Sequence, residues 1–249
     1  MNGPGHDRPI LEVEGLRKSF GGIVVVDDLS LAVGPDEALG LVGPNGAGKT
    51  TVFNLVAGDL GPDAGSVRFD GVDVTAMRPD RRCRAGIGRT AQVPRPYAGM
   101  TVFENVLVGA VFGARSRRSE RAGLGPTLAA LERAGLADRA NAPAGSLGLL
   151  DRKRLELARA LATEPRLLLL DEIAGGLTEA EVIELVDTIR AIRGRGVAVV
   201  WIEHIVHALV AVVDRIVAMS FGRKIAEGDP RDVMASREVQ EVYLGVVPG

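Results

Sequence analysis

Short apolar runs, separated by turns rich in glycine, proline and aspartate, recur along the chain. Residues 38–42, 167–170 and 197–203 are apolar almost throughout, which is typical of strands buried on both faces of a parallel sheet. Further strand-like stretches lie at residues 10–16, 29–33, 66–71, 215–220 and 224–227. The turn residues predicted between the first two of these are Gly21, Gly22, Asp27 and Asp28. This pattern predicts an α/β protein.

The middle of the chain has a different pattern. A stretch rich in proline and arginine at residues 78–96 interrupts the alternation, and residues 93–150 are expected to be mainly helical. Within this helical region, the charged segment at residues 113–121 contains Arg115, Arg117, Arg118 and Arg121. We interpret this segment as a solvated linker rather than as a lipid or partner contact.

The candidate chemistry begins directly after the apolar run 38–42. The loop that follows it consists of Gly43, Pro44, Asn45, Gly46, Ala47, Gly48, Lys49, Thr50 and Thr51. Its glycines let the backbone wrap around phosphate oxygens, so that N–H groups and a helix N-terminus point at the anion. Lys49 adds a charge near the β- and γ-phosphates, and Thr50 places a hydroxyl where a bridging Mg²⁺ ion would sit. The loop predicts binding and hydrolysis of ATP.

A glycine-rich turn can match this pattern by chance, so a second motif matters. Residues 167–170 are four leucines followed by Asp171 and Glu172. Carboxylates at the carboxyl end of a central parallel strand lie where ligands bind in open α/β sheets. We therefore expect Asp171 to hold Mg²⁺ through water and Glu172 to take a proton from the attacking water.

Between the two motifs, residues 147–161 (LGLLDRKRLELARAL) resemble the signature helix of ABC-type ATPases. The stretches GIGRTAQ, MTVFENVLVGA, LARALATEPRLLLLDE and GRKIAEGDP resemble, more narrowly, the ATP-binding subunits of branched-chain amino-acid importers. The resemblance covers residues 10–245. It implies a P-loop NTPase core of the ABC ATPase type, with an N-terminal antiparallel β region and a helical lobe inserted at about residues 93–154. Residues 1–9 and 246–249 are expected to be tails.

The resemblance also implies roles for three residues outside the two motifs. Phe20 stands where the family stacks an aromatic ring on adenine, Gln92 where it has a glutamine that senses the γ-phosphate and binds Mg²⁺, and His204 where it has a switch histidine. An aromatic near a turn can instead pack in the core, and a histidine after an apolar strand can be purely structural. The segment from Arg95 to Gly99 is the expected contact with a membrane subunit.

The signature segment departs from the family's usual Leu-Ser-Gly-Gly-Gln. Here it reads Leu147, Gly148, Leu149, Leu150 and Asp151. In the family this helix end binds the nucleotide of a second ATPase subunit with its N–H groups and dipole. Ile173 and Thr178 also differ from the residues usual at their positions. Either these differences have little kinetic effect, or the chain pairs with a different ATPase whose own signature completes its site.

Composition agrees with a cytoplasmic protein. The 249 residues include 46% hydrophobic residues, enough for one sizeable core, and the net charge of −2 gives no reason to expect nucleic-acid binding. A lone Cys83 suits a reducing compartment. Because no apolar run approaches the ~20 residues of a membrane-spanning helix and the N-terminus has no signal peptide, membrane contact is expected only through a partner.

The resemblance implies an import ATPase that works with two membrane-spanning permease subunits, a second ABC ATPase subunit and, indirectly, an external solute-binding protein. ATP and Mg²⁺ are the expected cofactors. Two alternatives stay open: the ATPase of an exporter such as the lipopolysaccharide-transport type, and a regulatory module that binds ATP without hydrolysing it. Leucine-like and other amino acids, urea and short amides all remain candidate solutes.

Overall fold

The computed structural model describes residues 8–113, 119–193 and 196–244. Its larger sheet has the strand order β10-β9-β3-β8-β7-β6. These strands are β3 (Ala38–Val42), β6 (Ile87–Arg89), β7 (Leu167–Asp171), β8 (Ala198–Ile202), β9 (Arg215–Ser220) and β10 (Arg223–Gly228). All neighbours pair in parallel except β9 and β10. Strands β3 and β7, which precede the two candidate motifs, therefore end at the same edge of one sheet, with β8 between them.

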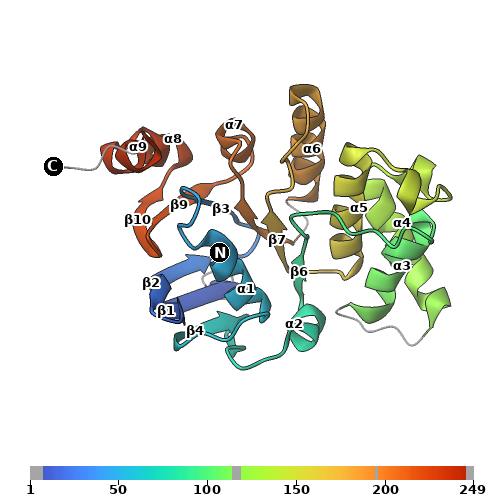
Figure 1. Ribbon diagram of the computed structural model, residues 1–249. Helices are drawn as coiled ribbons and strands as arrows, with labels where there is room; N and C mark the ends of the chain where they lie inside the picture. The colour runs from blue at the N-terminus through green and yellow to red at the C-terminus, as the bar shows by residue number, and fades with distance from the viewer. Residues whose placement is uncertain (1–7, 114–118, 194–195, 245–249) are drawn as a thin grey trace, which may run out of the picture.

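The second sheet is antiparallel and comes mostly from the N-terminal part of the chain (Figure 1). Its strands are β1 (Leu11–Phe20), β2 (Ile23–Val33), β4 (Ala64–Phe69) and β5 (Val72–Asp73), in the order β2-β1-β4-β5. The predicted turn at Gly21 and Gly22 joins β1 to β2. The predicted turn at Asp27 and Asp28 is wrong, because both residues lie inside β2.

A bulge in β2 explains this difference. Leu16 pairs with Leu29 but Lys18 pairs with Val26, so β2 contains an extra residue in this interval. Asp28 has a left-handed φ of 54°, which aspartate tolerates better than most residues. The two aspartates thus shift the register of a continuing strand rather than ending it.

Helices cover the larger sheet and extend beyond it. They are α1 (Lys49–Ala57), α2 (Pro79–Ala85), α3 (Val102–Phe112), α4 (Glu120–Arg133), α5 (Leu149–Ala162), α6 (Glu179–Ile192), α7 (Val206–Val210), α8 (Pro230–Ala235) and α9 (Arg237–Leu244), with short 3₁₀ turns at Ala137–Arg139 and Ala144–Ser146. None of the helices in the described ranges is long and apolar enough to cross a membrane.

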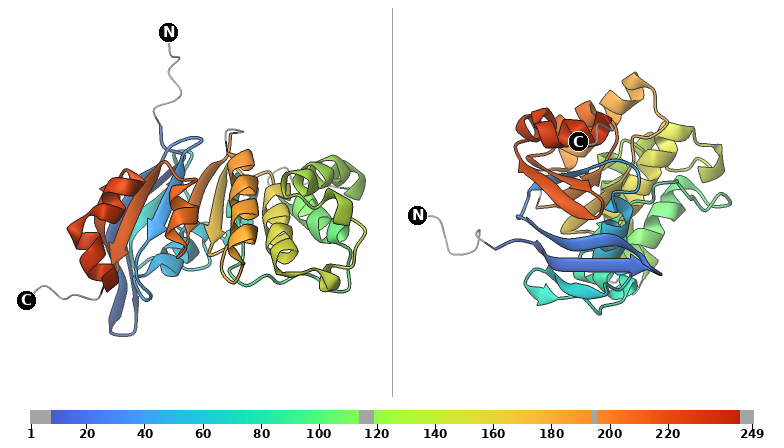
Figure 2. Two further views of the ribbon diagram at one scale, coloured as in Figure 1. Left: turned by 90° about the horizontal axis from the view of Figure 1, so that it is seen from above. Right: turned by 60° about the vertical axis from the view of Figure 1, so that its left-hand side comes forward.

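Helices α3, α4 and α5 gather at the end of the molecule away from the antiparallel sheet (Figures 1 and 2). Helix α5 continues without a break through residue 154, where the inserted lobe was expected to end. The division into core and lobe stays a prediction. Arg121 is exposed in the first turn of α4, whereas Arg115, Arg117 and Arg118 lie outside the described residues, as do residues 1–7 and 245–249.

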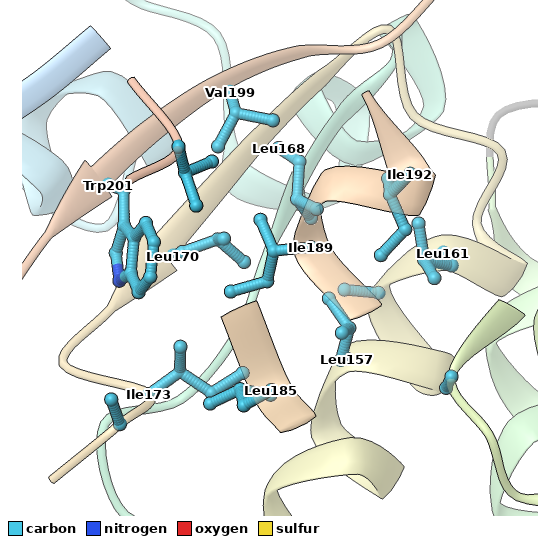
Figure 3. Packing of buried hydrophobic residues seen from close by; sticks show 14 of the residues in the cluster. Leu157, Leu161, Leu168, Leu170, Ile173, Leu185, Ile189, Ile192, Val199 and Trp201 are labelled. Atoms are coloured by element: carbon cyan, nitrogen blue, oxygen red, sulfur yellow. The ribbon is translucent and has the colours of Figure 1, made fainter. Parts of the chain in front are cut away.

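Two apolar clusters lie on opposite faces of the larger sheet. Leu168 and Leu170 of β7 point into one cluster, where they and Trp201 of β8 pack near α5 and α6 (Figure 3). Leu167 and Leu169 point into the other, under the antiparallel sheet and α1. Because successive side chains of a strand alternate between faces, the run of leucines supplies both clusters and fixes β7 in the centre of the fold.

A buried arginine positions the helix that starts at the candidate phosphate loop. The guanidinium of Arg82 donates to the carbonyl oxygens of Leu55 and Val56 at the end of α1, at 2.7 and 2.8 Å. It also donates to the carbonyl oxygens of Met77 and Thr75. A cation at a helix C-terminus satisfies carbonyls that have no partner within the helix. The last turn of α1 is thereby tied to the segment that leads into α2.

Candidate nucleotide site

The phosphate-loop motif forms the turn between β3 and α1. Gly48 caps the helix with a φ of 97°, and Gly43 and Gly46 also have positive φ values. A Cβ atom on Gly43 would lie 2.3 Å from the carbonyl oxygen of Met219, and one on Gly48 would lie 2.5 Å from that of Val25. Only glycine fits both the conformation and the space at these two positions. The N-terminus of α1 borders a pocket, and a helix N-terminus in that position suits an anion.

Lys49 lies within this loop rather than extending from it. Its ammonium donates to the carbonyl oxygens of Gly43 at 2.6 Å and Pro44 at 3.0 Å. Burial lowers the pKa of Lys49, and the negative charges of Glu172 and Asp171 partly oppose that shift. Residues 45–51 line a pocket of about 180 Å³ together with Val25 and Glu172. The loop and the second motif therefore form one site.

Asp171, the last residue of β7, is almost fully buried. Arg89 donates to its Oδ2 atom at 2.9 Å, whereas Oδ1 is buried without a hydrogen-bond partner among the described residues. Burial raises the pKa of Asp171, and Arg89 opposes that shift. Thr50, Gln92 and Asp171, the three predicted Mg²⁺ ligands, all line one pocket of about 400 Å³. An oxygen atom without a partner beside a hydroxyl and an amide is a donor set that suits Mg²⁺.

Glu172 brings the remaining predicted residues together. Gln92 donates from its Nε2 atom to Oε2 of Glu172, and His204 Nε2 lies 2.6 Å from Oε1. Glu172 has a left-handed φ of 46°, which is uncommon for a residue with a side chain. Gln92 follows β6, Glu172 follows β7 and His204 follows β8, so the order of the strands in the sheet explains why the three side chains meet.

Two charged residues of α5 contribute to this site and were missed from the sequence. The buried Lys153 donates to the carbonyl oxygens of Gln92 and Glu172. Glu156, one turn further, accepts from the backbone N–H of Arg95 at 2.9 Å. The sequence did contain a sign that these two residues are buried. Lys153 and Glu156 are three positions apart, which places both on the face of the helix that carries its apolar residues.

Two contacts from the C-terminal part of the chain were also missed. The backbone N–H of Gly43 donates to the hydroxyl of Tyr243 on α9 at 2.9 Å. Burial raises the pKa of Tyr243, and this hydrogen bond opposes the shift. Gly222, in the turn after β9, donates its N–H to the carbonyl oxygen of Ala47 at 3.2 Å. The first residue and the middle of the phosphate loop are thus in contact with residues of the C-terminal part of the chain.

Phe20 lies at the tip of the hairpin formed by β1 and β2. Its ring is 47% exposed, so the alternative in which it packs in the core does not apply. Lys18 places its ammonium 5.8 Å from the ring centroid. Val25, which lines the phosphate pocket, belongs to the same hairpin. The exposed ring thus lies on the hairpin that contributes Val25 to the pocket.

The signature residues lie apart from the other predicted site residues. Gly148 caps α5, Leu149 is 43% exposed and Leu150 packs partly against the apolar cluster. Asp151 lies 3.7 Å from Arg154 and 4.0 Å from a second arginine, Arg139. Among the described residues that line the two pockets above, none comes from 148–151. Within one chain, the signature end of α5 does not reach the phosphate loop.

A phosphate loop, a pair of carboxylates after a buried strand, and a glutamine and histidine beside them define an ATPase built on an ABC-type cassette. The sequence matches the family described as ABC transporter over residues 26–175, and the chain belongs to that family. Residues 223–247 match a second family, described as branched-chain amino acid ATP-binding cassette transporter. The predicted family and the predicted fold class are confirmed. The chain is the ATP-binding subunit of an ABC transporter and an ATP hydrolase.

Individual relatives agree over nearly the full length. The chain is 37% identical to the high-affinity branched-chain amino acid transport ATP-binding protein BraF of Pseudomonas aeruginosa, covering 96% of this chain and 98% of BraF. It is 35% identical to LivG of Escherichia coli, a protein with the same description, with the same coverage. A solved nucleotide-free ATP-binding cassette from an ABC transporter superimposes with a TM-score of 0.87 at 29% identity, covering 95% of this chain and 99% of that one.

Proposed function

We propose that this chain hydrolyses Mg·ATP to power the import of branched-chain or related amino acids. The observation that carries the catalytic part is the carboxylate of Glu172, which lies between Gln92 and His204 at the edge of the phosphate pocket. The import part is supported by the similarity to BraF and LivG and by the match of residues 223–247. These relatives favour an importer over an exporter of the lipopolysaccharide-transport type.

In this proposal the loop residues 43–51 bind the phosphates through backbone N–H groups, and the ammonium of Lys49 moves from the loop carbonyls to the β- and γ-phosphates. Thr50, Gln92 and Asp171 would hold Mg²⁺, which when bound would neutralise charge on the phosphates. The buried Oδ1 atom of Asp171 fits this role because it has no partner among the described residues. Phe20 stacks on the adenine ring.

Glu172 acts as the general base that takes a proton from the attacking water. His204, 2.6 Å from Glu172, orients the carboxylate and contacts the γ-phosphate. Gln92 holds the other carboxylate oxygen with its amide nitrogen, so its amide oxygen stays available to a cation. The protein thus supplies a positioned base beside the backbone N–H groups that bind the phosphates.

The signature residues 148–151 act across an interface with a second ABC ATPase subunit, either a copy of this chain or a different one. This assignment is supported by the position of these residues, none of which lines the phosphate pocket or the pocket beside Asp171 within the chain. Two membrane-spanning permease subunits receive the motion at the segment containing Arg95 and Tyr97, and an external binding protein delivers the solute. No nucleic acid takes part. The subunit is cytoplasmic and is held at the membrane by the permeases.

The test is Mg·ATP hydrolysis by the purified chain, alone and assembled with the ATPase and permease subunits encoded beside it, followed by leucine uptake into proteoliposomes. We expect turnover in the assembly that disappears with Glu172→Gln, and uptake that requires both ATP and the external binding protein. Hydrolysis without uptake of any branched-chain amino acid would reject the solute class. Bound ATP with no turnover in either form would favour the regulatory module, which the altered signature motivates.

A further inference from the structure

Lys153 is a buried cation at the catalytic centre, and the proposed roles above leave it without a function. It lies in the second turn of α5 and is 4% exposed. Burial lowers its pKa, while the carboxylates of Glu203, Glu172, Asp171 and Glu156 oppose that shift. An ammonium is costly to remove from water unless fixed partners replace the solvent. The partners that Lys153 has are therefore informative.

Those partners are backbone carbonyl groups of the two residues whose side chains meet. The Nζ atom donates to the carbonyl oxygen of Gln92 at 3.0 Å and to that of Glu172 at 3.3 Å. In the described part of the chain, Lys153 forms no ion pair within 4.0 Å with a carboxylate. The ammonium is thus not held by pairing with a neighbouring carboxylate. Here its donors instead connect the loop after β6 to the residue after β7.

The conformation of Glu172 makes its carbonyl group a sensitive contact point. Its φ of 46° places the backbone in the left-handed region, which costs free energy for a residue with a Cβ atom. The N–H of Glu172 donates to the carbonyl oxygen of Ile202 at 2.9 Å, and its carbonyl oxygen accepts from Lys153. The N–H of Gly175 donates to the same carbonyl oxygen, at 3.3 Å. Together these bonds hold the backbone on both sides of the Cα atom of Glu172 and so fix the direction in which its carboxylate leaves the backbone.

The same helix holds the segment after Gln92. Glu156 accepts from the N–H of Arg95, and Arg159, one further turn along, donates to the carbonyl oxygen of Arg95 at 3.1 Å. Residues 92–95 therefore follow any displacement of α5. The first turn of that helix carries the signature residues, so one rigid element connects the signature end to the backbone of Glu172.

We propose that Lys153 is a positioning residue that couples the location of α5 to the catalytic geometry of Gln92 and Glu172. This proposal rests on the proposed function of those two residues. When the signature end of α5 binds the nucleotide of the second subunit, Lys153 places the carboxylate of this subunit's own site. Removing the ammonium then loosens the base without removing any group that binds nucleotide.

The test compares Lys153→Met, Lys153→Arg and Lys153→Gln in the full transporter assembly, with kcat, KM and the Kd for Mg·ATP measured for each. Arg154→Met is the matched control, because it removes a cation one residue along α5 whose partners are Glu184 and Asp151. We expect Lys153→Met to lower kcat at least tenfold while the Kd changes less than threefold. Lys153→Arg should recover most of the rate, Lys153→Gln should fall between, and Arg154→Met should stay within twofold.

Thermal unfolding separates positioning from loss of the fold. If Lys153→Met does not fold, the Gln variant decides, since it keeps an N–H donor while removing the charge and shortening the side chain. Wild-type kcat in the folded Met or Gln variant would overturn the proposal, as would an equal loss in Arg154→Met. Glu172→Gln distinguishes a failure of the proposed role of Glu172 from a failure of the proposed role of Lys153. If that variant still hydrolyses ATP at the wild-type rate, the proposed function of Glu172 is wrong, whatever the Lys153 variants show.

Discussion

The carboxylates of Asp171 and Glu172 and the signature end of α5 belong to one cassette, but the fold holds them in different ways. Asp171 is 1% exposed and Glu172 is bonded to side chains from two other segments. Leu149 is 43% exposed, and Gly148 caps its helix without a side-chain hydrogen bond. The first region is organised within the chain, whereas the second is presented at its surface.

The different ways in which the two regions are held explain which of them tolerates departures from the family's usual residues. Around the carboxylates, Gln92, His204 and Arg89 form hydrogen bonds or close contacts with Asp171 and Glu172, and a substitution that left one of these groups unpaired would be costly. At the signature end the useful donors are backbone N–H groups, and these survive replacement of glycine by leucine. The chain keeps the family's carboxylates, glutamine and histidine in the first region, where only the neighbouring Ile173 differs from the usual residue, and it departs over several positions in the second.

The largest loss of activity is expected from a substitution at Glu172, the proposed general base of the first region. Glu172→Gln keeps the shape and most hydrogen bonds but removes the base, so kcat should fall by about 10²–10⁴-fold. Binding of Mg·ATP should change only a few-fold, as measured by fluorescence titration of a labelled nucleotide. Turnover that survives this substitution would show that the paired ATPase alone supplies the measured hydrolysis, or that another group is the base.

Lys49→Ala comes next, and here the loss should lie in binding. Hydrogen bonds to charged groups contribute about 1.5–3 kcal/mol, which corresponds to an increase of roughly 10- to 100-fold in the Kd for ATP. Equilibrium dialysis with ATP measures it. Lys224→Ala is the control, expected to stay within a few-fold, because it removes a cation outside the loop whose partner is Glu227. An unchanged Kd in the Lys49 variant would mean that the ammonium does not leave the loop carbonyls when nucleotide binds.

Leu149→Gly tests the second region directly. If leucine hinders close approach of the helix end to the partner's nucleotide, glycine should raise the rate of the assembly by about fivefold, equivalent to ~1 kcal/mol. Glycine in a helix also costs about 1 kcal/mol of stability. A rate measured alongside the melting temperature separates the two effects. No change in rate would show that the departure from the usual signature has little kinetic consequence.

The smallest effect is expected for Tyr243→Phe. It removes one hydrogen bond to Gly43, worth about 0.5–1.5 kcal/mol, and water can replace the hydroxyl because the side chain is half exposed. We expect the KM for ATP to rise at most about threefold, with kcat unchanged. A larger loss would place α9 among the elements that set the shape of the phosphate loop.

The sequence predicted what is local and missed what is not. The loop 43–51 and the carboxylates after 167–170 are each set by a strand and the turn that follows it, so their positions can be derived from a short window. The partners of Lys153 lie 61 and 19 positions away, and Gly43 lies 200 positions from Tyr243. Local sequence patterns cover too few residues to relate positions so far apart. Asp27 and Asp28 were predicted as a turn from their type, because a bulge uses the same residues.

The leucines of β7 have a further consequence, for how the protein comes apart. Leu168 and Leu170 belong to one apolar cluster and Leu167 and Leu169 to the other, so this single strand contributes side chains to both clusters. If β7 detaches, both clusters are opened to water at once. Heat or denaturant should therefore melt the two faces of the sheet in one cooperative transition, with far-ultraviolet circular dichroism and Trp201 fluorescence following the same curve.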